Sequence, residues 1–595
     1  GAWRDIAVRT RAELGRGETL EGPALVLEDH CTTFVAPAWR CRLDEAGALL
    51  LERDRDASAA RAVQPDVAEQ VEAVRTELFA GRLAAIAEEM GEVLQRTALS
   101  TNVKERLDFS CTVLDASGEL VVNAPHMPVH LGALGLCVRE VVAALPLGPG
   151  DVAVTNHPRY GGSHLPDITV ITSVHDEHDT LLGYVASRAH HAEIGGKRPG
   201  SMPPDATLLV EEGVVIAPRY LVRGEHARWD ELEALLRAGS APSPQPSSAQ
   251  RWPSRAVADN IADLRAAVAA NHLGASALRA IASERGTREV AAAMADLKAR
   301  AEREVRRALS ELDDGSYHAR THLDDGAELA VCIDIAGDRA RVDFSGSAGV
   351  HPGNLNATPA IVRGAVIYVL RLLVDRPLPL NEGLMAAVEL VLPHGMLSPD
   401  FSGADETLPA VVGGNVETSQ RLCDILLEAL GLMAHSQGTM NNFLFGSDRF
   451  GYYETICGGH GASADGPGTD AVHTHMTNTR ITDVEVLEQR YPVRLERFAV
   501  RRGSGGNGAH RGGDGAVREV TFLAPLSVSL LTQRRTRAPR GLAGGGDALP
   551  GCQTLFRADG RTQKLASIDA ADVEPGDRIV IETPGGGAYG YTGAR

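Results

Sequence analysis

The sequence predicts a multidomain α+β protein that combines mixed β-sheets with long helices. Three observations support this fold class. Short apolar runs separated by polar turns recur along the chain, as in strands and hairpins. Residues 255–273 and 287–312 have apolar positions at helical spacing with charged outer faces. The C-terminal part is rich in glycine and strand-forming residues, which indicates β structure.

Size and charge narrow the class of function. A chain of 595 residues with 44% hydrophobic content can bury several cores. Its 78 acidic and 59 basic side chains give a net charge of −19, which opposes binding to nucleic acid or to anionic membranes. The sequence contains no apolar run of bilayer length and no secretory signal pattern, so we expect a cytoplasmic protein. The eight cysteines form no C-x-x-C pair and are expected to be reduced.

The order of these patterns predicts five segments along the chain. Residues 241–253, rich in Ser, Pro and Gln, are interpreted as a flexible linker. The other predicted segments are a small β unit at 1–62, a metal-site region at 63–240, a helical scaffold at 254–312 and a β-rich region at 313–595.

A glycine motif at Gly503–Gly508 has the letters of the dinucleotide-binding fingerprint. A predicted strand at 517–523 follows it instead of a helix, so no helix N-terminus is available for a pyrophosphate. We interpret the motif as tight β-turns. Because the sequence also has no G-x-x-x-x-G-K-[ST] motif, we expect neither a Rossmann nor a P-loop domain and no ATP site in this chain.

A predicted hairpin carries candidate metal ligands at its open end. Its strands, 169–174 and 181–187, are separated by a polar turn. Asp167 precedes the first strand, His190 and His191 follow the second, and His164 lies one turn before Asp167. Imidazole nitrogens with a carboxylate oxygen are the ligands of hydrolytic zinc, and also of manganese or iron. Adjacent strand residues point to opposite faces, so His190 and His191 remain alternatives.

Further polar residues accompany this hairpin. Asp108 precedes another predicted strand at 109–114, which makes it a fourth candidate ligand. His126 and His130 either contact the site or cap the helix predicted at 131–142. Arg188 is a candidate anion clamp or an ordinary ion-pairing residue.

His473 and His475 alternate in the sequence. In a strand they would share a face and form a second metal site or an interface; the alternative is packing and hydrogen bonding to the loop 458–468. We favour the packing interpretation.

The motifs KERLDFSC, NAPHMPVHLG, GGSHLPDITV, ASRAHHAEIGG, GGNVETSQ and HTHMTNTR occur in this order. With them, the sequence from about residue 77 onward resembles the hydantoinase B/5-oxoprolinase family. This resemblance implies a divalent metal, most simply zinc, bound by Asp108, His164, Asp167 and His190. His191 or Glu193 would then move a proton, and Arg188 would contact an anionic substrate group.

The first residues resemble the C-terminal end of the hydantoinase A family in Glu21-Gly22-Pro23-Ala24 and Pro37-Ala38-Trp39-Arg40. The resemblance implies an arrangement like the C-terminal portion of a fused 5-oxoprolinase. ATP and Mg²⁺ would be bound by a hydantoinase A-like portion or subunit, in a homo-oligomer or a heterotetramer. The implied reaction is ATP-dependent opening of 5-oxo-L-proline to L-glutamate, as in glutathione metabolism. A hydantoinase or an acetone or acetophenone carboxylase subunit is the alternative, and a purely structural scaffold is a third.

Overall fold

A computed structural model describes residues 6–28, 31–37, 39–44, 47–53, 67–123, 127–224, 226–240, 251–376 and 378–591, with side chains in the first long helix from residue 74 onward. The chain divides into two compact units, Gly1–Glu77 and Leu78–Arg595. Most of the predicted linker at 241–253 lies outside the described residues.

The smaller unit is built from short strands. One sheet has the order β1-β3-β4 and another β2-β5-β6. Ala24 and Val26 alternate with more exposed neighbours along β3 and pack with Leu14, Val35 and Cys41 in a small core. The strands are β1 (Ala7–Thr10), β2 (Thr19–Glu21), β3 (Ala24–Leu27), β4 (Thr32–Val35), β5 (Trp39–Leu43) and β6 (Leu49–Arg53).

A seven-stranded sheet organises the first half of the larger unit, in the order β13-β12-β9-β10-β11-β7-β8. Its central strands are buried almost throughout, which explains why their apolar residues do not alternate with polar ones. The strands are β7 (Phe109–Asp115), β8 (Leu120–Asn123), β9 (Val152–Thr155), β10 (Asp167–His175), β11 (Leu181–His190), β12 (Arg219–Arg223) and β13 (His226–Ala227).

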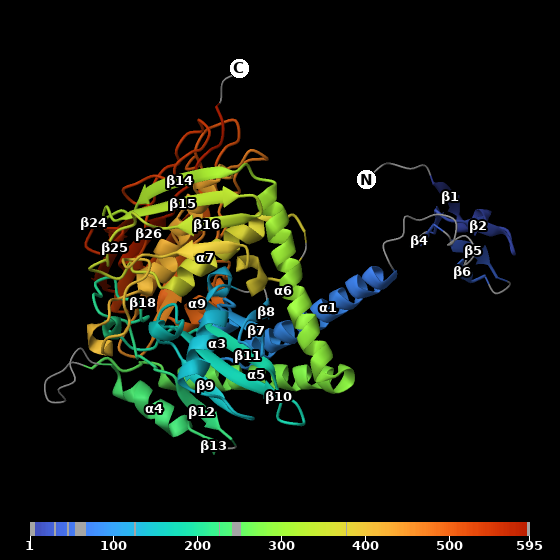
Figure 1. Ribbon diagram of the computed structural model, residues 1–595. Helices are drawn as coiled ribbons and strands as arrows, with labels where there is room; N and C mark the ends of the chain where they lie inside the picture. Colours follow the sequence, from blue (N-terminus) through green and yellow to red (C-terminus); the bar gives the residue numbers. More distant parts are fainter. Residues whose placement is uncertain are drawn as a thin grey trace. The chain divides into compact units, whose positions relative to one another are not determined.

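Helix α5 (Val257–Arg285) packs on β10 and β11 of this sheet (Figure 1). It extends beyond the predicted end at residue 273 and stops at Gly286, whose φ is +91°. The other helices are α1 (Val67–Thr97), α2 (Thr101–Lys104), α3 (Ala133–Ala144), α4 (Trp229–Ala238), α6 (Thr287–Ser310), α7 (Pro359–Leu373), α8 (Ser419–Ala429) and α9 (Val484–Arg490). None of the described helices is long and apolar enough to cross a bilayer.

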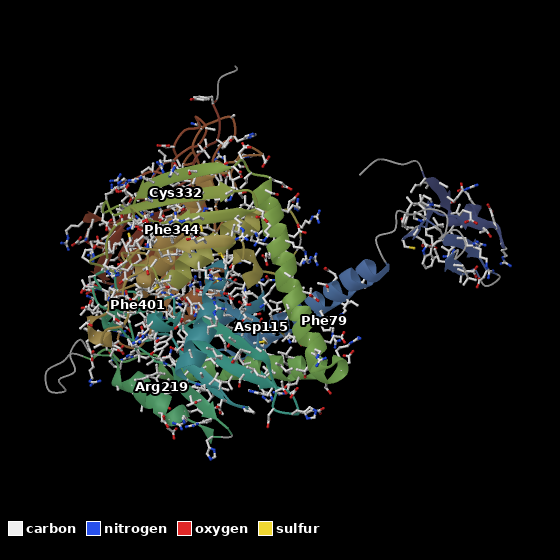
Figure 2. All side chains as sticks on the ribbon, in the orientation of Figure 1. Phe79, Asp115, Arg219, Cys332, Phe344 and Phe401 are labelled. Carbon is white, nitrogen blue, oxygen red and sulfur yellow. The ribbon has the colours of Figure 1, made fainter. Side chains whose placement is uncertain are left out.

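Three more sheets complete the larger unit, with the orders β14-β15-β16-β17, β19-β18-β22-β25 and β20-β21-β26-β23-β24. Phe344, labelled in Figure 2, follows β16 and is buried in the core that the β14-β15-β16-β17 sheet shares with α7 and α8. The strands are β14 (Gly315–His322), β15 (Glu328–Ala336), β16 (Arg339–Asp343), β17 (Val388–Val391), β18 (Asn442–Gly446), β19 (Gly451–Glu454), β20 (Val493–Arg501), β21 (Gly515–Phe522), β22 (Leu526–Leu531), β23 (Cys552–Phe556), β24 (Thr562–Lys564), β25 (Ile568–Val573) and β26 (Arg578–Glu582). The α+β class is confirmed, and the Gly503–Gly508 motif leads into strand β21 as predicted.

A π-helical turn, Gly414–Thr418, precedes α8. Its backbone passes so close to a neighbouring segment that a Cβ on Gly414 would lie 1.8 Å from the carbonyl oxygen of Asn356. Only glycine fits there. The turn matters because it carries Asn415, whose side-chain amide lies 3.1 Å from His164 Nε2.

Candidate functional site

The strand register brings the predicted carboxylates and imidazoles to one edge of the seven-stranded sheet. Asp167 is the direct antiparallel partner of His190 at the open end of the β10–β11 hairpin. Strand β7 pairs with the other side of β11, and the backbone N–H of His190 donates to the carbonyl oxygen of Asp108 at 3.0 Å. Strands β7, β10 and β11 therefore bring Asp108, Asp167 and His190 together.

Two further imidazoles converge on Asp167. Nε2 of His164 lies 3.3 Å from Asp167 Oδ2, and Nε2 of His130 lies 3.4 Å from the same oxygen. The ring centroids of His164 and His190 are 4.9 Å apart. His130 makes no capping hydrogen bond to α3, so the structure supports its contact with the site over the capping role.

His190 and His191 face opposite sides of the sheet edge. His190 lies beside His164, whereas Nδ1 of His191 lies 3.1 Å from Asn260 Nδ2 on α5. The orientation of that amide follows from a second bond, because Asn260 Nδ2 also donates to the carbonyl oxygen of Glu193 at 2.7 Å. Of the two alternatives, His190 is the one that lies with the other candidate ligands.

Burial and neighbouring charges set the protonation of the cluster. Burial raises the pKa of Asp108 to about 7, with Arg106 opposing and Asp167 reinforcing the shift. Burial also opposes ionisation of Asp167, but His164 and His130 outweigh it and hold the pKa of Asp167 well below its usual range. Burial and the adjacent His164 lower the pKa of His190, which favours its neutral form, the form that binds metals.

Several buried polar atoms of this cluster lack a hydrogen-bond partner in the described part of the chain: Asp167 Oδ1, His190 Nε2 and His164 Nδ1. Such atoms are costly to bury unless a ligand or ion satisfies them. As the side chains stand, however, no group of three or more His, Cys, Asp or Glu residues in the described ranges is arranged to hold a metal ion. The donor types fit a divalent metal, but coordination would require these side chains to reorient.

Residues distant in sequence complete the surroundings. The ring of Tyr453 on β19 stacks on His190 at 4.6 Å between centroids, and the Arg106 guanidinium lies 4.7 Å from the centroid of the same Tyr453 ring. Asn415 Nδ2 lies 3.1 Å from His164 Nε2, and Asn102 Nδ2 lies 3.0 Å from His190 Nδ1. The sequence interpretation missed these contacts, because nothing local links position 415 or 453 to the hairpin.

The candidate catalytic residues lie beside the cluster. The buried Glu193 carboxylate accepts bonds from Gly195 N–H and Gly200 N–H and pairs with Arg255 at 3.0 Å. Glu193 borders a cleft of about 550 Å³ at the start of α5, where Asp263 and Tyr491 also lie. Arg188 donates to Thr169 Oγ1 and to the carbonyl oxygen of Gly161, and its Nη1 is unpaired among the described residues.

The interpretation of His473 and His475 as strand residues is wrong. His475 has a φ of +53°, in the left-handed region, so the alternation of strand faces is interrupted there. His475 Nε2 lies 3.3 Å from Asp424 Oδ1 instead. The neighbouring Val472 does pair with Gly458 of the expected loop. His126 lies outside the described residues.

Comparison with known proteins identifies the family. A family model described as hydantoinase B/oxoprolinase matches residues 72–592. The chain belongs to the hydantoinase B/oxoprolinase family. A 5-oxoprolinase 1 from Arabidopsis thaliana is 43% identical over 99% of this chain and 47% of the relative. The chain thus spans about half the length of the curated relatives it matches first.

Two solved structures share the fold of this hydantoinase B/oxoprolinase chain. The ATP-dependent caprolactamase from Pseudomonas jessenii has a TM-score of 0.76 at 24% identity, covering 89% of this chain and 92% of that one. A nucleotide-free acetone carboxylase has a TM-score of 0.76 at 18% identity, covering 89% and 77%. At these identities the similarity shows a shared fold and does not show a shared reaction.

Proposed function

We propose that this chain is the ring-opening half of an ATP-dependent cyclic-amide hydrolase that converts 5-oxo-L-proline to L-glutamate. The buried Asp–His cluster at the β10–β11 strand ends carries the proposal. The 43% identity to a protein named 5-oxoprolinase 1 supports the substrate class. ATP and Mg²⁺ are assigned to a hydantoinase A-like partner, which would phosphorylate the lactam oxygen before water opens the ring.

The metal-binding part of the proposal names four residues: Asp108, His164, Asp167 and His190. They offer the nitrogen and oxygen donors of zinc, with manganese and iron as alternatives. The unpaired atoms of His164, Asp167 and His190 are those that a cation would satisfy. When bound, such a metal would polarise the substrate oxygen and lower the pKa of a water molecule toward neutrality.

The surrounding residues would hold these ligands in place. Tyr453 stacks on the His190 ring, and His130 shares Asp167 Oδ2 with His164. For His190 Nε2 to offer its lone pair, the proton must reside on Nδ1, where Asn102 must present its amide oxygen as acceptor. We therefore assign Asn102 the role of fixing the His190 tautomer.

Proton transfer and anion contact are assigned to residues beside the cluster. His191 and Glu193 make their bonds on the α5 side, so a proton-transfer role requires water to reach them through the 550 Å³ cleft. Arg188 Nη1 has no partner among the described residues, and its N–H groups suit a substrate carboxylate or phosphate.

Reconstitution tests the proposed function. The chain is mixed with a separately expressed hydantoinase A-like partner, and glutamate formation from 5-oxoproline is measured with and without ATP. We expect ATP-dependent glutamate formation that falls at least about a hundredfold in Asp167→Ala and His190→Ala. Hydantoin, and acetone with bicarbonate, are offered in parallel, and preferential turnover of acetone would favour the carboxylase alternative.

Matched variants come from the turn of the same hairpin. Asp179→Ala and His178→Ala change the same residue types at exposed positions and should leave activity unchanged. Normal ring opening with both Asp167 and His190 replaced would refute the assignment of chemistry to this cluster.

A further inference from the structure

The cleft at the start of α5 contains charged side chains to which the proposed reaction assigns no role. Its volume of about 550 Å³ lies within the range of small-molecule pockets, about 300–1,000 Å³. None of the described residues that line it belongs to the Asp–His cluster. Thr101 of α2 lines the cleft, whereas the next residue, Asn102, contacts His190. Helix α2 therefore contributes to the two sites through different residues.

Asp263 supplies a buried carboxylate oxygen that has no partner. This residue of α5 lines the cleft and is 1% exposed. Its Oδ1 accepts from the N–H groups of Leu99 at 2.8 Å and Ser100 at 3.2 Å. Its Oδ2 is buried and has no hydrogen-bond partner in the described part of the chain. Burying an unpaired carboxylate oxygen is costly, so this atom needs a donor from outside the described residues.

A second carboxylate lies next to Asp263. Asp259 precedes it by four residues on α5, and residues at this spacing are neighbours on one face of a helix. Asp259 also lines the cleft and forms no ion pair within the described ranges. Burial and the charge of Asp263 raise the pKa of Asp259, and Arg490 opposes the shift. Because like charges at this spacing repel, a positive group in contact with both carboxylates would stabilise the native state.

Arg490 brings a positive charge to the same place. Its Nη1 donates to the carbonyl oxygen of Leu99 at 3.3 Å. The N–H of the same Leu99 bonds to Asp263, so the guanidinium and the carboxylate meet at one residue. Arg490 also lines the cleft and forms no ion pair with a described carboxylate. Its charge is therefore available to a ligand.

Arg449 is a second arginine of the cleft with no ion pair among the described residues. The ring of its neighbour Phe450 packs against Tyr491, with 5.3 Å between centroids, and Tyr491 follows Arg490 directly. The two other arginines of the cleft are already paired with glutamates, at 2.6 and 3.0 Å. The charges left without a partner are thus two carboxylates and two guanidinium groups.

We propose that this cleft binds one free amino acid, a zwitterion that carries both an ammonium and a carboxylate. The ammonium would donate to Asp263 Oδ2 and to the Asp259 carboxylate, and the ligand carboxylate would accept from Arg490 and Arg449. A simple cation would leave the arginines without a partner, and a simple anion would leave the carboxylates without one. The inference does not depend on the proposed function, because 5-oxoproline has a neutral amide nitrogen and no ammonium.

Isothermal titration calorimetry of the full chain, without ATP or a partner subunit, tests the site. L-Leucine and L-glutamate are the zwitterionic probes, N-acetyl-L-leucine lacks the ammonium, and L-leucinamide lacks the carboxylate. We expect an amino acid to bind with one site per chain, and the two analogues to bind at least about tenfold more weakly than leucine. Absence of binding by both amino acids, or equal binding of either analogue and leucine, would overturn the proposal.

Two variants locate the ligand. Asp263→Asn keeps an acceptor for the two backbone N–H groups but replaces the unpaired oxygen with a donor, so it should weaken binding at least about tenfold. Arg490→Gln, at an exposed position, should have a similar effect and covers the case in which Asp263→Asn does not fold. Asp230→Asn and Arg288→Gln are matched exposed controls outside the cleft and should bind as wild type does. Wild-type affinity in Arg490→Gln would contradict the assignment.

A variant of the Asp–His cluster separates this inference from the proposed function. Asp167→Ala should lose ring opening in the reconstituted enzyme and should still bind the amino acid. 5-Oxo-L-proline should not displace the amino acid from the wild-type chain. Loss of amino-acid binding in Asp167→Ala, or displacement by 5-oxo-L-proline, would place the ligand in the Asp–His cluster and refute the cleft as its site.

Discussion

At the scale of single residues, the second nitrogen of each imidazole decides what the first can do. His190 illustrates this, because Asn102 contacts its Nδ1 while its Nε2 is left unpaired among the described residues. An asparagine can present either oxygen or nitrogen to the ring, and the two choices put the proton on opposite nitrogens. The proposed metal role requires the oxygen.

Replacing Asn102 tests this requirement. Aspartate can only accept, so Asn102→Asp should bind Zn²⁺ within a few-fold of wild type, whereas Asn102→Leu should bind roughly 10–100-fold more weakly. The measurement is competition for Zn²⁺ with a chromophoric chelator. Asn260→Leu removes the equivalent contact at His191 and should not change the affinity. Equal losses in Asn102→Asp and Asn102→Leu would show that the amide donates instead.

Part of the site could be predicted from sequence for a physical reason. Asp108, Asp167 and His190 lie at strand ends, and the two-residue period of a strand with its turn is readable locally. The choice between His190 and His191 was not readable, because it depends on which face α5 covers. Asn415 contacts His164 across 251 positions, a contact that only the tertiary fold creates.

At the scale of elements, the β10–β11 hairpin and the π-helical turn before α8 meet at the site. The hairpin was predicted from its alternation of apolar runs and turn, although both strands are longer than expected. The π-turn was not predicted. It begins at Gly414, whose backbone passes close to the carbonyl oxygen of Asn356.

Gly414→Ala tests the packing of this turn. Its Cβ would overlap the carbonyl oxygen of Asn356, so the backbone must move, at a cost of about 1–3 kcal/mol in the free energy of unfolding. The shift should also move Asn415 from His164. Gly466→Ala is the control, because nothing lies within 4 Å of a Cβ there. Denaturant unfolding compares the two, and equal stability would show that the turn tolerates a side chain.

The buried Glu212, which binds the segment just before the π-helical turn, should make the stability of the fold depend on pH. Its carboxyl group accepts from the N–H groups of Val411 and Val412, both at 2.9 Å, and burial raises its pKa to about 8. The folded state therefore keeps a proton that the unfolded state releases above about pH 4.5. As a result, the contribution of Glu212 to the free energy of unfolding falls as pH rises from about 4.5 to about 8. The Tm of Glu212→Gln relative to wild type should therefore rise between pH 5.5 and 8.5. A difference that stays constant with pH would mean that the group is already ionised in the fold.

At the scale of the whole molecule, the chain supplies the Asp–His cluster and its surroundings but no motif for binding a nucleotide. Its α+β class could be predicted, because the strand and helix periodicities are strong. The convergence of Asn415 and Tyr453 on one centre could not be predicted, since it depends on long-range packing. In the proposed function, this chain opens the ring and a partner hydrolyses the ATP.

Metal content of the purified wild-type chain tests the central claim most directly. Elemental analysis after gentle preparation, with and without added Zn²⁺ or Mn²⁺, should give close to one equivalent of a divalent metal. Asp167→Ala and His190→Ala should lose it and unfold at lower temperature, since metal bound to the native state adds stability. His178→Ala should retain it. A wild-type chain that contains no metal and regains none would contradict the account.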